Sequence, residues 1–489
     1  MATINKHNKT AYWRFNWVVN NLGWPLILGT LVLLALGAGF LAATGKALIT
    51  FGVVGALFCG LVVFKCFFDP VRGYYLLIFC GFFSEYPGRL LNKALPLTTF
   101  VELLVLVLFI GTYWHAKNDQ NQKGSLLRYS ISILLIIYSV YYIVELFNPD
   151  MDNAVGWLFN SKRFTMQILF YVISYRLINT PDRFRYFMKF WIVMAFIAAL
   201  YGCYQQWFGL LPRELSSIDP HEFGLLYQGG VIRKFSFLEG VVTFGNLCGC
   251  FAVITIILAI NEKVRKRKWQ LGFISFILFL GLTYSGTRTF SLMIPAGIAL
   301  YVLMSLRNKA TLTTLFVTFM CVLFILFAPI DNPSLNRMRS TFNTEEESLT
   351  VRTFNRKSIQ PYVYAHPIGG GVATSGVEGM RFNPDHPLAG FPPDSGLLKI
   401  ALDMGWIGLA VTMLVFLWVL YQGIYYYFQM KNEEYKKYIV AVTCAIFAVI
   451  ITLYAQVTIG QMPTVFFIFG MMSLMKRLKE WDDEERTHA

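Results

Sequence analysis

Long apolar stretches recur along the whole chain, separated by short polar connections. A helix needs about 20 mainly apolar residues to cross a hydrocarbon core of about 30 Å. Strands of a membrane barrel instead alternate apolar and polar positions, whereas these stretches are continuous. Of the 489 residues, 56% are hydrophobic and 14% are charged, compared with about 25% charged residues in soluble domains. The sequence therefore predicts an all-α polytopic membrane protein.

Fourteen stretches qualify as candidate spans. They cover residues 24–43, 47–66, 72–84, 95–115, 126–146, 163–178, 185–209, 237–260, 268–284, 288–306, 310–329, 395–427, 436–457 and 461–475. The third and sixth are short for a full crossing, so we expect twelve to fourteen transmembrane helices. The chain then divides into a transmembrane part over 1–329, a long external loop with short helices over 330–394, and a second transmembrane part with a polar tail over 395–489.

The basic residues indicate the orientation in the membrane. On one set of alternate connections, from the N-terminus to the tail, we count 24 lysines and arginines, and every connection in this set carries at least two. The short connections of the other set carry nine. Because the basic side of a membrane protein is cytoplasmic, both termini are expected inside and the 330–394 loop outside, in the periplasm or at the cell exterior. The pattern therefore predicts a multi-pass protein of the cytoplasmic membrane.

Several classes of function are disfavoured by the same reading. The net charge of +14 is spread over short clusters between apolar stretches, without the extended basic face of a nucleic-acid-binding protein. The eight cysteines lie in or beside apolar stretches and none lies in the long loop, so packing is their expected role. No phosphate-binding loop motif is present. We expect no metal and no cofactor.

The external loop contains a candidate surface helix. Its segment "NTEEESLTVRTFNRKSIQPY" begins with Thr344 and Glu347 at the spacing of a capping box, and Pro361 is expected to limit it. Arg352 and Arg356 are four residues apart and lie on one face, where like charges destabilise a helix. Both arginines either reach water and lipid phosphates, or hold an anion with two guanidinium forks that match phosphate geometry.

Two further basic points lie on the same external side. Arg288 sits in the short connection "SGTRT", and Arg233 lies in "GGVIRKFSFLEG" just before a span. An unpaired charge at the membrane boundary is costly, so Arg288 either extends to the headgroups or binds an anion. Arginines from separate helix mouths that converge would suit the diphosphate of a membrane lipid.

The polar stretch "AHPIGGGVATSGVEGMRFNPDHPLAGFPPDSG" supplies candidate acid–base groups. His366 opens a Pro/Gly turn in which Gly369–Gly371 either end the helix or allow close approach of the backbone to a ligand. His386 follows later in the loop. Asp394 and Ser395 precede the next span, where Asp394 is either a helix cap or a general base.

At this point the chain resembles the superfamily of O-antigen ligases and O-antigen polymerases. The resemblance is carried by three segments between about Arg233 and Leu409: "SGTRT" at the start of a span, "VRTFNRKSIQPYVYAHPIGGGVATSG", and "DSGLLKIALDMGWIGL". Many ligases of the family have His-Asn where this chain has Asp394-Ser395. Because of that departure, a polymerase is at least as favoured as a ligase. The general base would be Asp394, His386 or no side chain at all.

The resemblance implies a GT-C-like, all-helical, metal-independent glycosyltransferase with an external catalytic face. It implies a polyprenyl-diphosphate-linked glycan as donor, and a further glycan or a lipid A core as acceptor. Arg233, Arg288 and Arg352 or Arg356 would bind the diphosphate of the donor, with Asp394, His386 and His366 as the candidate catalytic groups. Inverting transfer is the expected reaction. Other polysaccharide-assembly proteins are possible partners.

Two other classes of function stay open. A transporter or flippase for lipid-linked or anionic polysaccharide would suit the number of spans, although such proteins usually carry intramembrane charges in broken helices. Glu102 is the single well-placed midspan carboxylate that we identify, and a helix–helix polar contact is its expected role over a proton relay. A purely structural scaffold would leave the external arginines without a task.

Overall fold

The structure is a computed structural model that describes residues 47–91, 97–116, 126–219, 223–224, 226–228, 230–306, 347–458 and 460–488, with single positions between 313 and 339. The expected span at 24–43, most of the span at 310–329 and the expected cap at Thr344 lie outside these residues. The chain divides into two compact units, residues 1–69 and residues 70–489. The first unit contains helix α3 (Ala47–Phe68).

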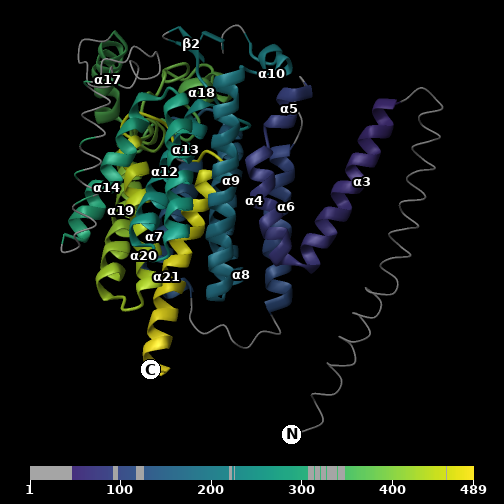
Figure 1. The fold of residues 1–489 in the computed structure, drawn as a ribbon. Helices are drawn as coiled ribbons and strands as arrows, with labels where there is room; N and C mark the ends of the chain where they lie inside the picture. Colours follow the sequence, from purple (N-terminus) through teal and green to yellow (C-terminus); the bar gives the residue numbers. More distant parts are fainter. Residues whose placement is uncertain are drawn as a thin grey trace. The chain divides into compact units, whose positions relative to one another are not determined.

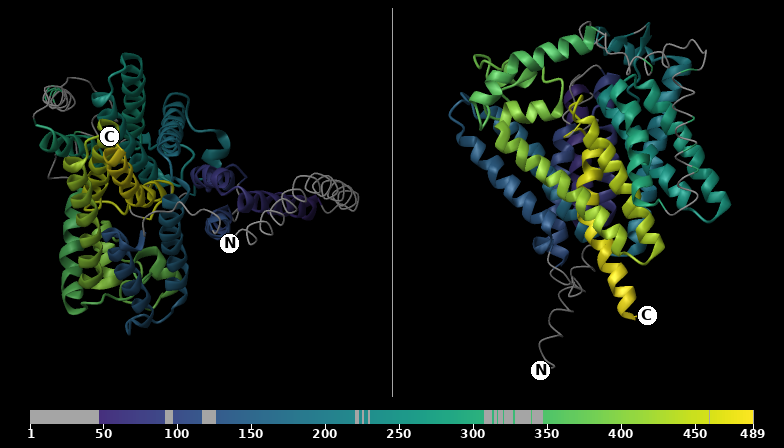
Figure 2. Two further views of the ribbon diagram at one scale, coloured as in Figure 1. Left: turned by 90° about the horizontal axis from the view of Figure 1, so that it is seen from below. Right: turned by 90° about the vertical axis from the view of Figure 1, so that its left-hand side faces the viewer.

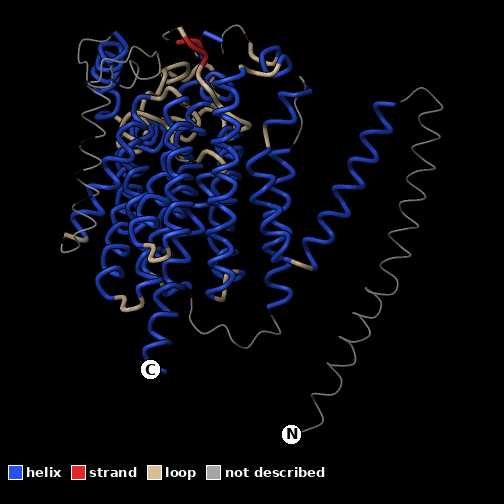
Figure 3. Tube along the Cα trace, in the orientation of Figure 1, coloured by secondary structure: helices blue, strands red, loops and turns tan. Residues whose placement is uncertain are grey.

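The second unit is built almost wholly of helices (Figures 1 and 3). They are α4 (Pro70–Phe83), α5 (Tyr86–Leu91), α6 (Leu97–Ala116), α7 (Ser130–Val144), α8 (Val155–Leu177), α9 (Pro181–Phe208), α10 (Pro212–Ser216), α12 (Val241–Asn261), α13 (Arg265–Tyr284), η3 (Arg288–Leu292), α14 (Met293–Met304), α17 (Glu347–Ala365), α18 (Gly376–Phe382), α19 (Gly396–Gln429), α20 (Glu433–Thr452) and α21 (Thr464–His488). The two short strands β1 (Tyr227–Gln228) and β2 (Val231–Ile232) pair as an antiparallel hairpin.

The expected fold class is confirmed. Helices coincide with twelve of the fourteen expected spans. Within the described ranges, six helices are long and apolar enough to cross a membrane, namely α6, α7 with the turn that follows it, α9, α12, α19 and α20. Side chains of Ile133, Ile137 and Val140 on α7 are exposed, as expected for a helix face that meets lipid.

Helix α12 forms the centre of the second unit. It is buried along most of its length and packs against α9, α13, α14 and α20. Small residues allow this close approach, because a Cβ on Gly245 would come within 2.4 Å of the Phe290 ring and one on Gly249 within 2.3 Å of the Met293 sulfur. Small residues at helix interfaces are typical of membrane bundles, in which van der Waals packing replaces the hydrophobic effect.

Polar connections gather at the two ends of this bundle. Helices α10, α17 and α18 and the hairpin lie at one end, and α21 ends at the other (Figure 1). The right-hand view of Figure 2 shows α17 lying across the first end. The first end, called here the loop end, comprises residues 209–240, 285–288, 347–395 and 453–463. All sequence-predicted site residues lie at the loop end.

Two local expectations need correction. Helix α17 continues past Pro361 to Ala365, because the missing N–H of one proline removes a single backbone hydrogen bond, which the flanking turns can tolerate. The span expected at 395–427 is not one straight helix. It is interrupted at Gly405, which has φ 64° and ψ −170°, a conformation that a residue with a Cβ rarely adopts.

The interruption at Gly405 explains the glycine-rich turn after His366. The N–H of Gly370 donates to the carbonyl of Leu402 (2.8 Å), and a Cβ on Gly405 would meet the Pro367 carbonyl oxygen at 2.0 Å. Close backbone approach is therefore the role of these glycines, and the partner is the backbone of α19 rather than a ligand.

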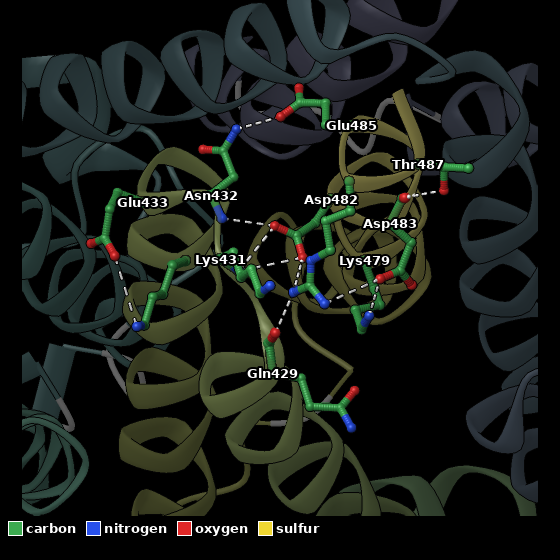
Figure 4. Close-up of polar contacts among 11 residues, drawn as sticks. Gln429, Lys431, Asn432, Glu433, Lys479, Asp482, Asp483, Glu485 and Thr487 are labelled. Atoms are coloured by element: carbon green, nitrogen blue, oxygen red, sulfur yellow. Dashed lines mark hydrogen bonds and ion pairs between the residues drawn. The ribbon is translucent and has the colours of Figure 1, made fainter. Parts of the chain in front are cut away.

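At the opposite end, the tail helix α21 holds the turn between α19 and α20 (Figure 4). The Asp482 carboxylate accepts the backbone N–H groups of Lys431 (3.1 Å) and Asn432 (2.8 Å) and pairs with Arg486. Asn432 in turn accepts the Glu434 N–H and caps α20. One carboxylate thus satisfies the exposed donors of a turn and ties three helices together.

We expect Asp482→Ala to destabilise the protein by about 2–4 kcal/mol, because it leaves two backbone donors and one guanidinium without their shared acceptor. The melting midpoint of the purified protein in detergent measures the effect. Asp483→Ala is the matched control, since the Asp483 side chain is 52% exposed and forms surface ion pairs, which contribute about 0–1 kcal/mol. Equal midpoints for the two variants would contradict this role of Asp482.

Candidate functional site

Three arginines from separate segments meet at the loop end. The Nε of Arg233 donates to the carbonyl of Ser285 (3.1 Å), and its Nη2 donates to Oγ1 of Thr287 (2.6 Å). Arg288 is the next residue and begins η3. The hairpin segment and the short connection before η3 are therefore joined through the side chain of Arg233, which places Arg233 beside the backbone that carries Arg288.

Arg352 approaches the same place from α17. Arg288 and Arg352 are both half-buried, and their positive charges act on each other. Two guanidinium groups that repel each other in a partly desolvated setting gain stability when an anion lies between them. A diphosphate suits this place, because pairs of its oxygens accept bidentate hydrogen bonds from the planar guanidinium of arginine.

Arg356 turns to a neighbouring segment. Its Nη2 donates to the carbonyl of Tyr454 (2.7 Å), and its guanidinium lies 4.4 Å from the centre of the Tyr454 ring. This contact joins α17 to the connection between α20 and α21. Of the four arginines expected to bind a diphosphate, the structure brings Arg233, Arg288 and Arg352 together and gives Arg356 a structural contact.

Asp394 is half-buried immediately before α19. The side chain that caps this helix belongs to Ser395, whose Oγ accepts the Leu398 N–H (3.4 Å) and donates to the Leu453 carbonyl (2.9 Å). The carboxylate of Asp394 is therefore not the cap of α19. Its neighbour Ser395 joins the same 453–454 segment that Arg356 contacts.

The two histidines lie in a second cluster at the end of α17. The His366 ring stacks on Tyr362 with centroids 3.9 Å apart, and its Nδ1 is 2.9 Å from the Tyr362 carbonyl. Its Nε2 lies 3.9 Å from the Asp150 carboxylate. His386 is buried, and its Nδ1 accepts the Leu388 N–H (3.1 Å). Tyr362, with its ring centre 6.5 Å from that of His386, connects the two histidines.

Their hydrogen bonds show which of the two neutral histidines has a nitrogen free to accept a proton. A carbonyl at Nδ1 of His366 requires a proton on that nitrogen, so in the neutral ring Nε2 keeps a free lone pair. The Leu388 N–H at Nδ1 of His386 requires the opposite tautomer, with the proton on Nε2. Neutral His366 can therefore accept a proton at Nε2, whereas His386 has no free nitrogen lone pair.

Burial lowers the pKa of His386, and this lowering outweighs the opposing effects of the carboxylates of Asp150, Asp152 and Asp403; the positive charge of His366 adds to it. An unfolded chain protonates this histidine near pH 6.5, whereas the folded chain does not until a lower pH. Its contribution to stability is therefore present above about pH 6.5 and is lost as the pH falls through that value toward the folded pKa.

We expect the melting midpoint to fall between pH 7.5 and pH 5.5, and to fall less in His386→Asn. Asparagine keeps an acceptor for the Leu388 N–H and removes the titrating group. Thermal melts of both proteins at the two pH values measure the difference. An identical loss of stability in the variant would show that other groups carry the pH dependence.

A cavity of about 490 Å³ opens among α4, α6, α8, α18, α19 and the segment before α21. Its floor is apolar and includes Phe82, Phe416 and Phe469. Charged and amide side chains also line it; they are Glu85, Glu102, Asn160, Arg163, Gln167, Glu239, Glu378, Lys399, Asp403 and Gln461. None of the predicted site residues is among its lining residues.

Ion pairs connect this lining across three helices, α8, α18 and α19. Lys399 Nζ lies 3.0 Å from Glu378 and 3.1 Å from Asp403, and Arg163 lies 3.6 Å from Glu378. Asp403 is buried and also accepts from the Ser375 hydroxyl. Glu378 thereby fixes α18, at the loop end, to α8 and α19.

Glu102 on α6 pairs with Lys162 on α8 at 2.8 Å, which confirms the expected helix–helix polar contact. The expectation that Glu102 is the single well-placed midspan carboxylate is wrong, because Asp403 is a second one. The signal was present in "GLLKIALDMG", where Lys399 and Asp403 stand four residues apart in an apolar segment. Ionisable residues in such segments are functional candidates by default.

Comparison with known families supports the motif reading. Residues 273–413 match the family model described as O-antigen ligase. The matched segment runs from α13 into α19 and includes Arg288, Arg352, Arg356, His366, His386 and Asp394, while Arg233 precedes it. The chain has no match among curated proteins.

Proposed function

We propose that this chain is a membrane glycosyltransferase of the O-antigen ligase/polymerase superfamily that uses a polyprenyl-diphosphate-linked glycan as donor. The family match over residues 273–413 supports this proposal. The acceptor is another glycan repeat unit or a lipid A core. The reaction takes place at the loop end, which the lysine and arginine distribution assigns to the outer face of the cytoplasmic membrane. Polymerase and ligase activity differ only in the acceptor.

The convergence of Arg233, Arg288 and Arg352 carries this proposal. Three separate segments supply one guanidinium each: the residue after the hairpin, the first residue of η3, and α17. Cationic groups positioned where negative charge develops are usually the largest contribution to catalysis. The diphosphate of the donor is the group on which that charge develops, so the three guanidinium groups stabilise the leaving group without a metal ion.

The proposed reaction is a single displacement with inversion. An acceptor hydroxyl oxygen attacks the anomeric carbon and forms the new glycosidic bond. The bond from that carbon to the diphosphate oxygen breaks, and the lipid diphosphate leaves with the electron pair. The hydroxyl proton passes to a side chain acting as general base, which contributes about 10²–10⁴ in rate.

Asp394 is the base that we favour, with His366 second. Asp394 is half-buried, and the adjacent Ser395 satisfies the cap of α19, so its carboxylate is not needed for helix stability. His366 has a free Nε2 but lies with Tyr362 and Asp150 in the second cluster. His386 has no free lone pair in its neutral form.

We expect Asp394→Asn to lower turnover by about 10²-fold or more, with unchanged melting behaviour. The rate of polyprenyl diphosphate release by the reconstituted protein measures turnover. His366→Gln is the matched comparison and is expected to have the smaller effect. A larger loss in His366→Gln than in Asp394→Asn would reverse the assignment of the base.

A transporter or flippase remains a second candidate, favoured by one observation. Helix α19 is broken at Gly405 and carries the Lys399–Asp403 pair beside a cavity, and broken helices with charged groups are typical of transporter sites.

Reconstitution in vesicles separates the two functions. The purified protein is given a fluorescent polyprenyl-diphosphate oligosaccharide and an unlabelled glycan acceptor. A glycosyltransferase releases polyprenyl diphosphate and lengthens the glycan. A flippase moves intact donor between leaflets and releases nothing, a result that would overturn the proposed function.

A further inference from the structure

The cavity among α4, α6, α8 and α19 is lined by none of the three arginines, and one segment links its lining to α17, the helix that carries Arg352. Leu453 and Gly396 line the cavity. The carbonyl of Leu453 accepts the Gly396 N–H (2.9 Å), while the next residue, Tyr454, accepts from Arg356 on α17. The segment at 453–454 therefore has the cavity on one side and the arginine-bearing helix α17 on the other.

The charges of the cavity are unsuited to a diphosphate. Its described lining contains five carboxylates, Glu85, Glu102, Glu239, Glu378 and Asp403, and two cations, Arg163 and Lys399. Both cations already form ion pairs with carboxylates. Lys399 pairs with Glu378 and Asp403, and Arg163 pairs with Glu378. An anionic ligand would meet an excess of like charge, whereas the arginine cluster attracts it.

Two exposed carboxylates of the cavity lining can accept further hydrogen bonds, and we call their position the mouth of the cavity. Glu85 and Glu239 are its exposed carboxylates. Glu85 accepts one hydrogen bond, from Thr98 at 2.9 Å. Among the described residues, Arg89 donates a hydrogen bond to the backbone carbonyl of Glu239 and not to its carboxylate. Carboxylates accept several hydrogen bonds each, so this mouth matches a ligand rich in hydroxyl donors.

The walls and floor complete the fit. A volume of about 490 Å³ falls in the range of about 300–1,000 Å³ typical of small-molecule sites, which are mostly apolar with a few placed polar groups. The amides of Asn160, Gln167 and Gln461 add both donors and acceptors to the lining. An apolar floor beneath a polar mouth suits the face and the edge of a sugar ring.

We propose that this cavity binds an uncharged sugar residue of the acceptor glycan, with its hydroxyls donating to Glu239 and Glu85. The inference rests on the proposed glycosyl transfer, because that reaction requires an acceptor site beside the donor site, and holding both reactants in place supplies much of the rate. The segment Leu453–Tyr454, which lines the cavity and binds the arginine-bearing helix α17, keeps the two sites on adjoining elements.

Binding is tested separately from turnover. The purified full chain in nanodiscs is titrated with the methyl glycosides of glucose, galactose and N-acetylglucosamine, followed by saturation-transfer NMR, and with inorganic pyrophosphate, followed by calorimetry. Glu239→Gln is expected to weaken binding of the preferred glycoside about tenfold or more, since it removes a charged acceptor. Ser84→Phe, which fills the cavity and leaves every charge in place, is expected to abolish it.

Both variants are expected to bind pyrophosphate like the unchanged chain. Asp385→Asn is the matched control, because Asp385 is an exposed carboxylate at the same end of the bundle that does not line the cavity; it should leave both affinities unchanged. Arg288→Ala should show the reverse pattern, with pyrophosphate binding lost and glycoside binding kept.

Three outcomes overturn the acceptor assignment. They are no binding of any glycoside, glycoside binding that neither cavity variant weakens, and loss of pyrophosphate binding in the cavity variants. The last would make the cavity part of the donor site. Failure of the proposed function has a different signature, because glycoside and pyrophosphate would then bind normally while the reconstituted protein releases no polyprenyl diphosphate.

Discussion

Replacing Arg288 with alanine is expected to lower the rate of glycosyl transfer by about 10²–10³-fold, the usual cost of removing one preorganised group that stabilises charge in a transition state. Arg288 is the central member of the cluster, with Arg233 bonded to the preceding residue and the charge of Arg352 acting on it. The effect should appear mainly in turnover, because charge on the leaving diphosphate grows as the bond to the sugar breaks.

The same replacement should leave the folded protein intact. The positive charge of Arg352 acts unfavourably on that of Arg288, so the interaction between these two arginines does not stabilise the fold. A role of Arg288 in stability alone predicts the opposite, a lower melting midpoint with normal turnover per folded molecule. Measuring the melting midpoint and polyprenyl diphosphate release on one preparation separates these roles.

Companion variants sharpen the result. Arg288→Lys keeps the charge and loses the bidentate fork, so it should recover only part of the rate. The double variant Arg288→Ala/Arg352→Ala should lose less than the product of the two single losses, because groups that act on one anion are not additive. Arg213→Ala controls for general loss of positive charge, since Arg213 is exposed on α10 at the same end. Full activity in both single alanine variants would eliminate the diphosphate site.

The largest effect on stability is expected from Lys399→Met. This change leaves Asp403 buried without a cation and removes the 3.0 Å partner of Glu378. Breaking a buried ion pair by removing one partner costs about 3–5 kcal/mol, because the remaining charge stays desolvated. We therefore expect a large fall in the melting midpoint and in the yield of folded protein.

A second substitution should recover much of the lost stability. In Lys399→Met/Asp403→Asn the buried carboxylate is neutral, and the amide still offers an acceptor to the Ser375 hydroxyl. Lys436→Met is the matched control, because Lys436 pairs at 3.8 Å with the 75% exposed Glu433 and surface pairs contribute about 0–1 kcal/mol. If the double variant is no more stable than Lys399→Met, the uncompensated charge is not the cause of the loss.

Helix formation and the position of most spans could be predicted from sequence because they depend on local composition. An apolar run must satisfy its own backbone hydrogen bonds in lipid, and only a helix does so within a single segment. The same local logic placed the start of α19 after the Asp394–Ser395 pair, but it expected Pro361 to limit α17, which continues to Ala365. It missed the break at Gly405, because that conformation depends on the Pro367–Gly370 turn packed against it.

The residues of the candidate site could be predicted from sequence, but their contacts could not. Arg233, Arg288 and Arg352 could be named from their motifs and from their positions at the mouths of separate spans. That these three lie together, while Arg356 bonds to Tyr454 and the histidines cluster with Tyr362 and Asp150, depends on contacts between residues far apart in sequence. No periodicity or spacing encodes such contacts.

The sequence by itself determined the helical class, the spans and the residue types available at the loop end, since each follows from the free energy of transferring a short segment between water and lipid. Only the tertiary structure decided which charges lie close enough to neutralise each other. Lys399, Glu378 and Asp403 come from distant segments and satisfy one another. Coulomb interactions fall off with distance and depend on local desolvation, and both quantities exist only once the helices are packed.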